Sequence, residues 1–323
     1  MPHKKHKKKS TIIIWLEFIP FLMLYKLIRI LPLKLAYLIN RAIFRAIFFL
    51  DRKHRRRAIQ HIMHAAIRDN KKTAKKLALA SYNSFAKLLV EIIKSDQYYS
   101  ADKISVTGSQ ATIDRAVTKH GENINVILVT AHYGNWEVAG NAWAEYTGIP
   151  MASIMRPFNN PLIGKIILKN RASALHEMIP KQGGVKGIFK AIKQKKIATF
   201  LVDQHASTKD GGVETIFFGQ PCRTHTAPAL LHLKTGVPIM PELTRRIDDD
   251  FHFEFMVGEL IEYTPTDDKE QDIKNITQLY TTALEKMIAD KPEQWLWTHR
   301  RWLNINRKSK YTKKKSEELN RDV

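Results

Sequence analysis

Hydrophobic residues along the chain form three patterns, and each pattern predicts a different structure. Residues 11–31 are almost continuously apolar, as in a helix that meets a hydrophobic environment on most sides. Residues 36–50 and 58–99 carry apolar side chains at three- and four-residue spacing, which is typical of amphipathic helices. From about residue 104, short apolar runs alternate with helical periodicity. This alternation predicts an α/β fold with a central mixed sheet flanked by helices.

Within the α/β part, the boundaries of the elements follow from the apolar runs and the turn residues between them. The predicted strands are 126–131, 149–155, 197–202, 213–218, 238–245 and 251–258, and the predicted helices are 136–146, 162–176, 185–195, 227–235 and 272–290. Because the carboxyl ends of parallel strands meet at one edge of a sheet, polar residues that follow these strands are expected to share a crevice.

The apolar N-terminus predicts attachment to a membrane. Residues 11–31 are about long enough to cross the roughly 30 Å hydrocarbon core, although Glu17, Pro20, Lys26 and Arg29 interrupt them. The amphipathic helix that follows ends in a basic run at residues 52–57, which suits an anionic membrane surface. We therefore expect one transmembrane or deeply embedded helix whose basic flanks keep the rest cytoplasmic. The alternative is a buried first helix followed by a solvated charge run.

These patterns divide the chain into four parts. Residues 1–10 form a basic tail, residues 11–50 form the membrane-anchoring and amphipathic helices, residues 51–303 form the main domain, and residues 304–323 form a basic flexible tail. A chain of 323 residues can bury a sizeable core as one large domain with such an appendage.

Charge and cysteine content narrow the function classes. A formal net charge of +22 favours anionic partners such as lipid headgroups, nucleic acid or an acidic carrier protein. The single cysteine, Cys222, excludes an intramolecular disulfide and every zinc pattern built on paired cysteines. The chain also contains no Gly-x-Ser-x-Gly elbow, Walker loop or Gly-x-Gly-x-x-Gly segment, which removes several enzyme classes.

The strongest chemical signal lies at residues 130–137, Thr-Ala-His-Tyr-Gly-Asn-Trp-Glu, directly after the strand 126–131. His132 stands at the carboxyl end of the strand, and Glu137 stands at the start of the next helix. Neutral imidazole accepts a proton well near pH 7, and a carboxylate on its far nitrogen fixes the tautomer and stabilises the imidazolium. The pair therefore suits direct activation of a substrate hydroxyl. The alternative is a core histidine with Glu137 as a solvated acid that favours the helix dipole.

Further polar residues follow the next strands. Arg156 and Asn159 lie in a proline-bounded loop after the strand 149–155, where a guanidinium could bind a phosphate or stabilise an oxyanion. Asp203 and Gln204 close the strand 197–202. Asp203 could orient Arg156 or Arg171 or bind a substrate hydroxyl, and the alternative is a turn residue or helix N-cap without a role in the site. His205 is a rival base without an acid at a comparable spacing.

Ordered segments of the chain resemble the late acyltransferases of lipid A biosynthesis. Ala-His-Tyr-Gly-Asn-Trp-Glu is similar to their His-x4-acid motif. The later blocks Arg-Pro-Phe-Asn-Asn-Pro, Val-Asp-Gln, Phe-Phe-Gly, Thr-Gly-Val-Pro-Ile-Met-Pro and Pro-Glu-Gln-Trp-Leu-Trp-Thr-His-Arg-Arg-Trp follow in the family's order, from about residue 50 to 303. The helical region 58–99 and the very basic N-terminus depart from the family pattern.

The resemblance implies transfer of a fatty acyl chain from acyl carrier protein to a hydroxyl of a lipid A precursor, without a metal or redox cofactor. It implies a location on the cytoplasmic face of a bacterial inner membrane, with residues 51–303 as the acyltransferase domain. His132 carries over as the base and Glu137 as its acidic partner. The candidate substrate-binding residues are Arg156, Asn159, Arg171, Asp203 and Gln204. Other acceptors stay open: a lysophospholipid, another glycolipid or an aminolipid.

Two aromatic segments leave further alternatives. Phe217 and Phe218 precede a turn and a helix that Thr224 or Thr226 is expected to cap, and these aromatics are expected either in the core or along an acyl tunnel. Trp295, Trp297 and Trp302 alternate with arginines, as in an interfacial belt or a stacking platform for bases. With the high charge, this segment supports a remote alternative, a polyanion-binding protein, but the chain carries no nucleic-acid-binding motif.

Overall fold

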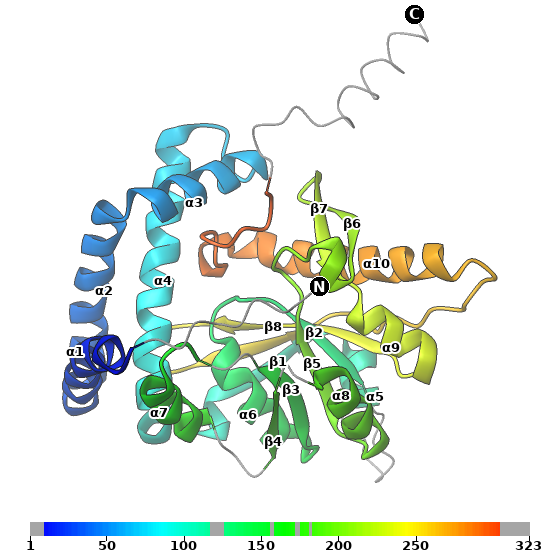
Figure 1. Cartoon of the computed structure of the whole chain (residues 1–323), viewed down its shortest axis with the longest axis horizontal. Coiled ribbons are helices and arrows are strands. Elements are labelled where there is room, and N and C mark those ends of the chain that lie inside the picture. Colours follow the sequence, from blue (N-terminus) through cyan, green and yellow to red (C-terminus); the bar gives the residue numbers. More distant parts are fainter. Residues whose placement is uncertain (1–9, 117–125, 156–157, 172–174, 181–182, 304–323) are drawn as a thin grey trace, which may run out of the picture.

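The computed structural model describes residues 10–116, 126–155, 158–171, 175–180 and 183–303 (Figure 1). Its helices are α1 (Thr11–Ile30), α2 (Leu33–Leu50), α3 (Arg52–His64), α4 (Lys71–Tyr98), α5 (Gln110–Ala116), α6 (Trp136–Thr147), α7 (Pro161–Arg171), α8 (Gly184–Lys193), α9 (Ala227–Thr235) and α10 (Lys269–Asp290). Its strands are β1 (Ile104–Gly108), β2 (Ile127–Thr130), β3 (Met151–Met155), β4 (His176–Pro180), β5 (Ile197–Leu201), β6 (Gly212–Phe217), β7 (Gln220–His225), β8 (Ile239–Arg246) and β9 (Phe253–Val257).

Seven strands form one mixed sheet in the order β1-β9-β8-β2-β5-β3-β4, and β6 and β7 form a separate antiparallel hairpin. The strands β8, β2, β5, β3 and β4 are parallel to one another, whereas β9 is antiparallel to β8 and parallel to β1. This architecture confirms the predicted α/β fold with a central mixed sheet.

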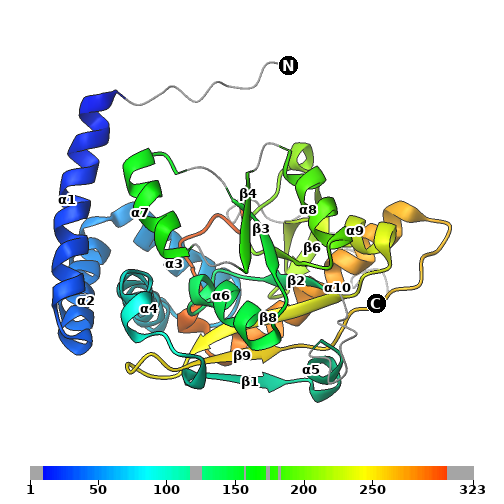
Figure 2. The same cartoon turned by 90° about the horizontal axis from the view of Figure 1, so that it is seen from below.

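Helices cover both faces of the sheet, and alternate residues of each strand enter two separate cores. On one face, Ile127 and Val129 of β2 pack in a cluster with residues of α8, α9 and α10. On the other face, Leu128 packs with Trp143 of α6 and with residues from the carboxyl half of α4. The long α4 crosses beside the sheet and contributes to both cores (Figure 2). Three layers result, with the sheet in the middle.

The turn between β2 and α6 is fixed by its own residues. Gly134 has φ of +53°, and a Cβ there would lie 1.9 Å from the carbonyl oxygen of Thr244, so only glycine fits. The Asn135 side chain then caps α6 by accepting hydrogen bonds from the backbone N–H groups of Glu137 and Val138. Gly148, in the left-handed conformation, ends the helix. The helix predicted at 136–146 is confirmed with these boundaries.

Several elements differ from the sequence-based expectation. The region 58–99 is two helices, because α3 ends after His64, Ala66 takes a positive φ of 51°, and Asn70 caps α4. His176 belongs to β4 rather than to the preceding helix. Thr226 occupies the cap position of α9 but donates its hydroxyl to Gly211 instead, and Thr224 is buried in β7. The missed strands β1 and β4 lie at the two edges of the sheet, where half-exposed residues weaken the apolar signal.

The N-terminal helices lie along one side of the molecule, where α1 and α2 run in different directions (Figures 1 and 2). Among the described residues, α1 is the one helix long and apolar enough to cross a membrane. Its polar residues turn toward the protein: Glu17 accepts a hydrogen bond of 3.1 Å from Asn160 at the start of α7, and Arg29 pairs with Asp96 of α4. Apolar side chains such as Leu16 and Met23 remain exposed. This arrangement explains how a helix interrupted by charges still presents an apolar outer face.

Candidate active site

His132 and Asp203 meet because they follow neighbouring parallel strands. Thr130 of β2 pairs with Leu201 of β5, so the residues two positions beyond each strand emerge side by side at the carboxyl edge of the sheet. Asp203 Oδ1 accepts a hydrogen bond of 2.8 Å from Nδ1 of His132, and Asp203 Oδ2 accepts one of 3.0 Å from the His132 backbone N–H. The shared crevice expected from the sequence is therefore present.

Asp203 is a buried carboxylate whose oxygens are fully used. Besides His132, the indole Nε1–H of Trp295 donates to Asp203 Oδ2 at 2.8 Å. Burial alone would raise the pKa of Asp203, but the attraction of His132 and the hydrogen bonds from His132 and Trp295 hold it below its usual range. The group is therefore an anion that fixes the His132 imidazole with Nδ1 protonated, which leaves Nε2 as the nitrogen that can accept a proton.

The sequence predicted that Glu137 would be the carboxylate bonded to the imidazole of His132. In the structure the carboxylate bonded to Nδ1 is Asp203, for which the sequence suggested other roles. Glu137, at the start of α6, lines the same cavity as His132 and accepts a hydrogen bond of 3.1 Å from Nε1 of Trp136. The catalytic role of Glu137 stays a prediction.

A second histidine, which the sequence interpretation missed, stands beside the first. The rings of His299 and His132 are perpendicular, with centroids 4.5 Å apart. The side-chain amide nitrogen of Gln204 lies 3.3 Å from Nε2 of His132 and 3.4 Å from Nε2 of His299. Burial lowers the pKa of His299 to about 3, so its ring is neutral at neutral pH. The rival His205 has a pKa lowered by burial and by nearby arginines.

Residues of the segment 292–302 pack in the core next to Asp203 and bond to it and to its neighbours. Trp295 and Trp297 are fully buried and Trp302 nearly so, which contradicts both an interfacial belt and a stacking platform. The buried guanidinium of Arg301 lies over the Phe217 ring at 4.7 Å and donates to the carbonyl oxygens of Val202 and Gln204, on either side of Asp203. Phe217 is therefore a core residue, as in the first of the two alternatives that the sequence left open, the core or an acyl tunnel.

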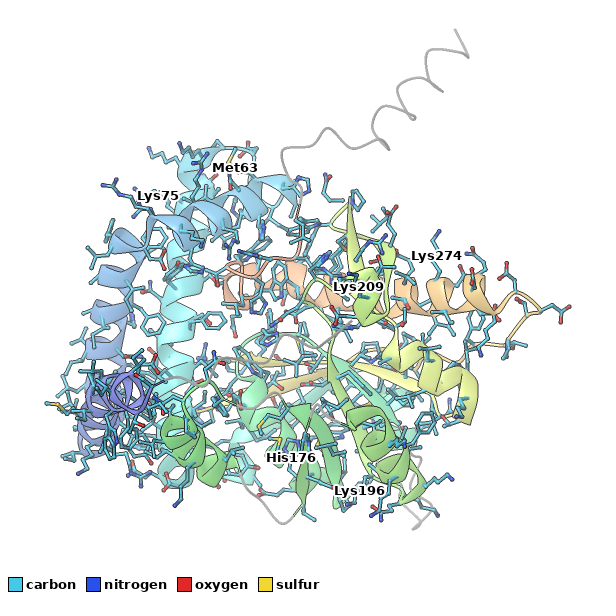
Figure 3. The ribbon with its side chains drawn as sticks, viewed as in Figure 1. Met63, Lys75, His176, Lys196, Lys209 and Lys274 are labelled. Carbon is cyan, nitrogen blue, oxygen red and sulfur yellow. The ribbon has the colours of Figure 1, made fainter. Side chains whose placement is uncertain are left out.

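Beside His132, a cavity of about 310 Å³ lies between α6 and the sheet. Its walls include apolar residues of α6 and of the strands β2, β3, β4 and β5, such as Trp143, Leu128 and Met178. His176 of β4, labelled in Figure 3, lies against Gly140 of α6 and hydrogen-bonds Ser153 of β3 at 2.8 Å.

The buried carboxyl of Glu242 is also part of this cavity wall. Burial raises its pKa to about 7, and the hydroxyls of Thr244 and Thr130 donate hydrogen bonds to it. The cavity is thus a largely apolar pocket with the His132 imidazole and the weakly ionised carboxyl of Glu242 among its wall residues.

The other residues predicted to bind substrate are Asn159, Arg156 and Arg171, and none of them is among the described residues that line the cavity. Asn159 is exposed in the loop before α7, and it is not among the residues that line the cavity. Phe158, its neighbour, does line the cavity. Arg156 lies outside the described residues, and so does the side chain of Arg171 at the end of α7. Their proposed contacts with substrate stay predictions.

His132, Asp203 and His299 also satisfy the spacing of a metal site, since their donor atoms lie within 4.8 Å of one another. However, both oxygens of Asp203 already accept hydrogen bonds from three N–H groups, and Nδ1 of His132 carries one of these hydrogens. A metal ion would have to displace these bonds. The donor set therefore fits proton transfer better than metal binding.

The chain is similar in sequence to several curated acyltransferases. The chain is 26% identical over 182 residues to the lipid A biosynthesis palmitoleoyltransferase of Escherichia coli strain K12, covering 56% of each chain. It is 24% identical over 197 residues to the lipid A biosynthesis lauroyltransferase of the same strain, covering 61% of each. It is also 24% identical over 184 residues to the phosphatidylinositol mannoside acyltransferase of Mycobacterium tuberculosis strain H37Rv, covering 56% of this chain and 55% of that protein.

These matches span little more than half the length of the curated relatives. A family model described as bacterial lipid A biosynthesis acyltransferase extends much further, because it matches residues 2–304. The chain therefore belongs to the bacterial lipid A biosynthesis acyltransferase family.

Proposed function

We propose that the protein is an O-acyltransferase that moves a fatty acyl chain from an acyl carrier protein thioester to a hydroxyl of a lipid A precursor. The observation that carries the proposal is the His132–Asp203 pair beside a largely apolar cavity, in a chain of this family. The His132 side chain is hydrogen-bonded to Asp203 and Gln204 and not to a Ser or Cys hydroxyl or thiol among the described residues, so direct attack by the acceptor hydroxyl fits the site best.

The reaction follows from the tautomer of His132. Nε2 accepts the proton of the acceptor hydroxyl while its oxygen attacks the thioester carbonyl carbon, which forms the new C–O bond and a tetrahedral oxyanion. Asp203, bonded to Nδ1, stabilises the imidazolium that results. Collapse of the oxyanion breaks the C–S bond, and the leaving thiolate takes the proton back from Nε2. Arg156 or nearby backbone N–H groups would stabilise the oxyanion.

The cavity would hold the acyl chain. His132 follows β2, and Leu128 of the same strand lines the cavity wall four residues earlier. At 3.2–3.4 Å per residue, these positions span roughly 13 Å along the strand. The acyl chain would extend along β2, with the thioester carbonyl near Nε2 of His132. Glu137, in the cavity wall, would add negative charge that favours the imidazolium.

The arrangement of the N-terminal helices supports approach of a lipid acceptor. Asn160, at the start of α7, donates to the Ile14 carbonyl oxygen and to Glu17 of α1. The loop that leads to Asn160 carries Phe158, which lines the cavity. We infer that α1 and α2 rest in the cytoplasmic face of a bacterial inner membrane and hold α7 at its surface, so that the acceptor reaches the site from the bilayer. The net charge of +22 favours an acidic carrier protein and phosphorylated lipids alike.

A second acceptor class is a mannosylated membrane lipid. The likeness to the phosphatidylinositol mannoside acyltransferase is of the same size as the likeness to the lipid A enzymes, at 24% and 26% identity. The shared chemistry is acylation of a sugar hydroxyl on a membrane-bound glycolipid. Assays with the two acceptors, each paired with the same acyl carrier protein thioester, distinguish them.

Loss of the base tests the proposal. Purified His132→Ala is expected to lose acyl transfer by about 10²- to 10⁴-fold, because the acceptor hydroxyl then meets no proton acceptor. The measurement is transfer of a labelled acyl chain to a lipid A precursor, with folding checked by circular dichroism. Wild-type turnover in His132→Ala would contradict the mechanism. Unchanged lipid A in cells that lack the gene, seen by mass spectrometry, would contradict the acceptor.

A further inference from the structure

His132 and His299 are arranged around the same two side chains. Each ring directs Nδ1 toward the carboxylate of Asp203, at 2.8 Å for His132 and 3.9 Å for His299. Each ring directs Nε2 toward the amide nitrogen of Gln204, at 3.3 and 3.4 Å. Two imidazoles thus stand between one anion on the inner side and one exposed amide on the outer side.

The contacts of Gln204 determine which nitrogens carry hydrogen. An amide nitrogen has two hydrogens and donates both, so Nε2 of each ring must be the accepting nitrogen. Both neutral rings then carry their hydrogen on Nδ1, which agrees with the Nδ1 hydrogen bond from His132 to Asp203. Gln204 and Asp203 therefore select the same tautomer of His132 from opposite sides.

His299 remains neutral in this place. Burial lowers its pKa, the neighbouring His132, His61 and Arg57 lower it further, and Asp203 opposes them. Its Nδ1 is buried and has no hydrogen-bond partner among the described residues. A neutral second ring adds no positive charge beside His132, whose ring must become cationic during the reaction.

The position of Gln204 has a consequence for substrate binding. Its N–H occupies the Nε2 lone pair of His132 that a substrate hydroxyl would need. When a hydroxyl takes that lone pair, the amide loses one of its two acceptors and keeps the other, Nε2 of His299. Without His299 the amide would have no alternative acceptor at this point and would compete with the substrate.

We propose that His299 is a positioning residue, which holds the Gln204 amide while the acceptor hydroxyl binds Nε2 of His132. The inference rests on the proposed function, because it takes His132 as the base. In the resting site Gln204 bridges both rings and keeps His132 in the reactive tautomer. In the occupied site it is retained by His299, and the perpendicular His299 ring keeps the His132 ring in place.

The first test is His299→Phe, which keeps an aromatic ring against His132 and removes both nitrogens. We expect kcat to fall by about 10- to 100-fold, the usual effect of removing an outer partner of a functional imidazole. KM for the acyl donor should stay unchanged, whereas KM for the acceptor should rise, because the Gln204 amide then competes with the acceptor hydroxyl for Nε2 of His132. His299→Gln, which restores a hydrogen-bonding group toward Gln204, should recover part of kcat. His252→Phe is the matched control, since His252 pairs with Asp248 on the remote β8–β9 turn and should leave kcat unchanged.

The second test is a double-mutant cycle with Gln204→Leu, a change at an exposed residue that keeps the fold. The inference predicts that His299→Phe and Gln204→Leu each lower kcat and that the double variant loses little more than either one. Additive losses, or a KM for the acceptor that stays at the wild-type value in His299→Phe, would overturn it. So would wild-type kcat in His299→Phe.

The activities of His132→Ala and His299→Phe together separate the proposed function from the role of His299. If His132→Ala is inactive and His299→Phe is fully active, the proposed function stands and only this inference is lost. If His132→Ala keeps its activity, both are lost. Should His299→Phe not fold, the comparison of Gln204→Leu with His299→Gln decides, because both act on the same hydrogen bond.

Discussion

Two carboxylates belong to the site around His132, and they are held in different ways. Asp203 is buried and bonded directly to the imidazole, whereas Glu137 is half-buried and faces the cavity. Loss of either charge weakens the stabilisation of the imidazolium, so we expect Glu137→Gln to lose on the order of 10²-fold in turnover and Asp203→Asn at least as much. Glu137→Asp, which keeps the charge at a shorter reach, should retain partial activity. The measurement is kcat for each variant after its folding has been checked.

Comparing Glu137→Gln with Asp203→Asn also shows which of the two acids supports His132. A fully active Glu137→Gln enzyme beside an inactive Asp203→Asn enzyme would leave Asp203 as the only acidic partner of His132. Asp203→Asn needs the folding check most, because its amide hydrogens would meet the N–H groups of His132 and Trp295 that now donate to the carboxylate.

The buried carboxyl of Glu242 makes the stability of the folded protein depend on pH. Its folded-state pKa is raised by burial from 4.5 to about 7, so between these values the folded protein binds more protons than the unfolded one. Its contribution to stability therefore falls as pH rises through this window. Glu242→Gln removes the penalty, and we expect the variant to be more stable than wild type by about 3 kcal/mol at pH 8, an order-of-magnitude figure from the shift to about 7, with no difference near pH 4.

Unfolding by denaturant in detergent at several pH values measures this difference. Glu214→Gln, at an exposed glutamate of β6, is the matched control and should show no gain that grows with pH. A constant difference between wild type and Glu242→Gln at all pH values would mean that the carboxyl ionises alike in both states.

At the scale of elements, a buried hydrogen-bond network fixes the turn that carries His132 into α6. Asn135 caps α6 with its side-chain oxygen and donates its amide to Glu91 of α4 at 2.9 Å. Glu91 is fully buried and also binds Arg246 of β8 and the hydroxyl of Tyr37 of α2. Because a buried charge needs such partners, α4, β8 and α2 are held together at the base of the turn that carries His132. The N-terminal helices are thereby joined to the active site.

The sequence predicted the elements whose signals are local. The buried strand β2, the helix α6 and its end at Gly148, and the exact span of α9 all follow from apolar runs and caps. The same reasoning placed His132 and Asp203 at one crevice, because both follow strands. It did not identify their direct contact, since the order β8-β2-β5-β3 depends on packing across the whole sheet.

His299 shows most clearly what local patterns omit. It follows η3 (Pro292–Gln294), in a segment whose tryptophans suggested an exposed surface. The side chains in fact enter the core, where Trp295 bonds Asp203 and Arg301 binds the carbonyl groups beside it. No spacing within the segment reveals a partner so far away in sequence. A buried Trp/Arg segment and an exposed one have the same composition, and tertiary contacts alone decide between them.

At the scale of the whole molecule, positive charge and apolar surface have different distributions. Lysines such as Lys75, Lys209 and Lys274 are exposed over separate elements (Figure 3). Exposed large apolar side chains, in contrast, concentrate on α1 and α2, including Ile12, Trp15 and Leu38. Charge spread in this way attracts anionic surfaces from any side, whereas the apolar face of α1 gives the attachment its orientation.

If the protein attaches to the membrane through α1, the apolar contribution to binding can be measured separately from the electrostatic one. Leu16, Ile19 and Met23 are 67%, 50% and 68% exposed on the outer face of α1. Each would contribute about 1.5–3 kcal/mol when buried in lipid, so changing all three to Gln should release the protein from vesicles of anionic lipid. Gln has a helix propensity close to that of Leu and Met, so the helix itself should persist.

Vesicle flotation with the full chain measures this release, and a triple change at Leu230, Ile247 and Leu279 is the matched control. These residues are 42%, 54% and 46% exposed, but they lie on or near α9, β8 and α10, away from α1. Wild type and control should stay bound in 1 M salt, where the Debye length is about 3 Å and charge attraction is screened. If salt alone released the wild type, its attachment would be electrostatic and α1 would not be embedded.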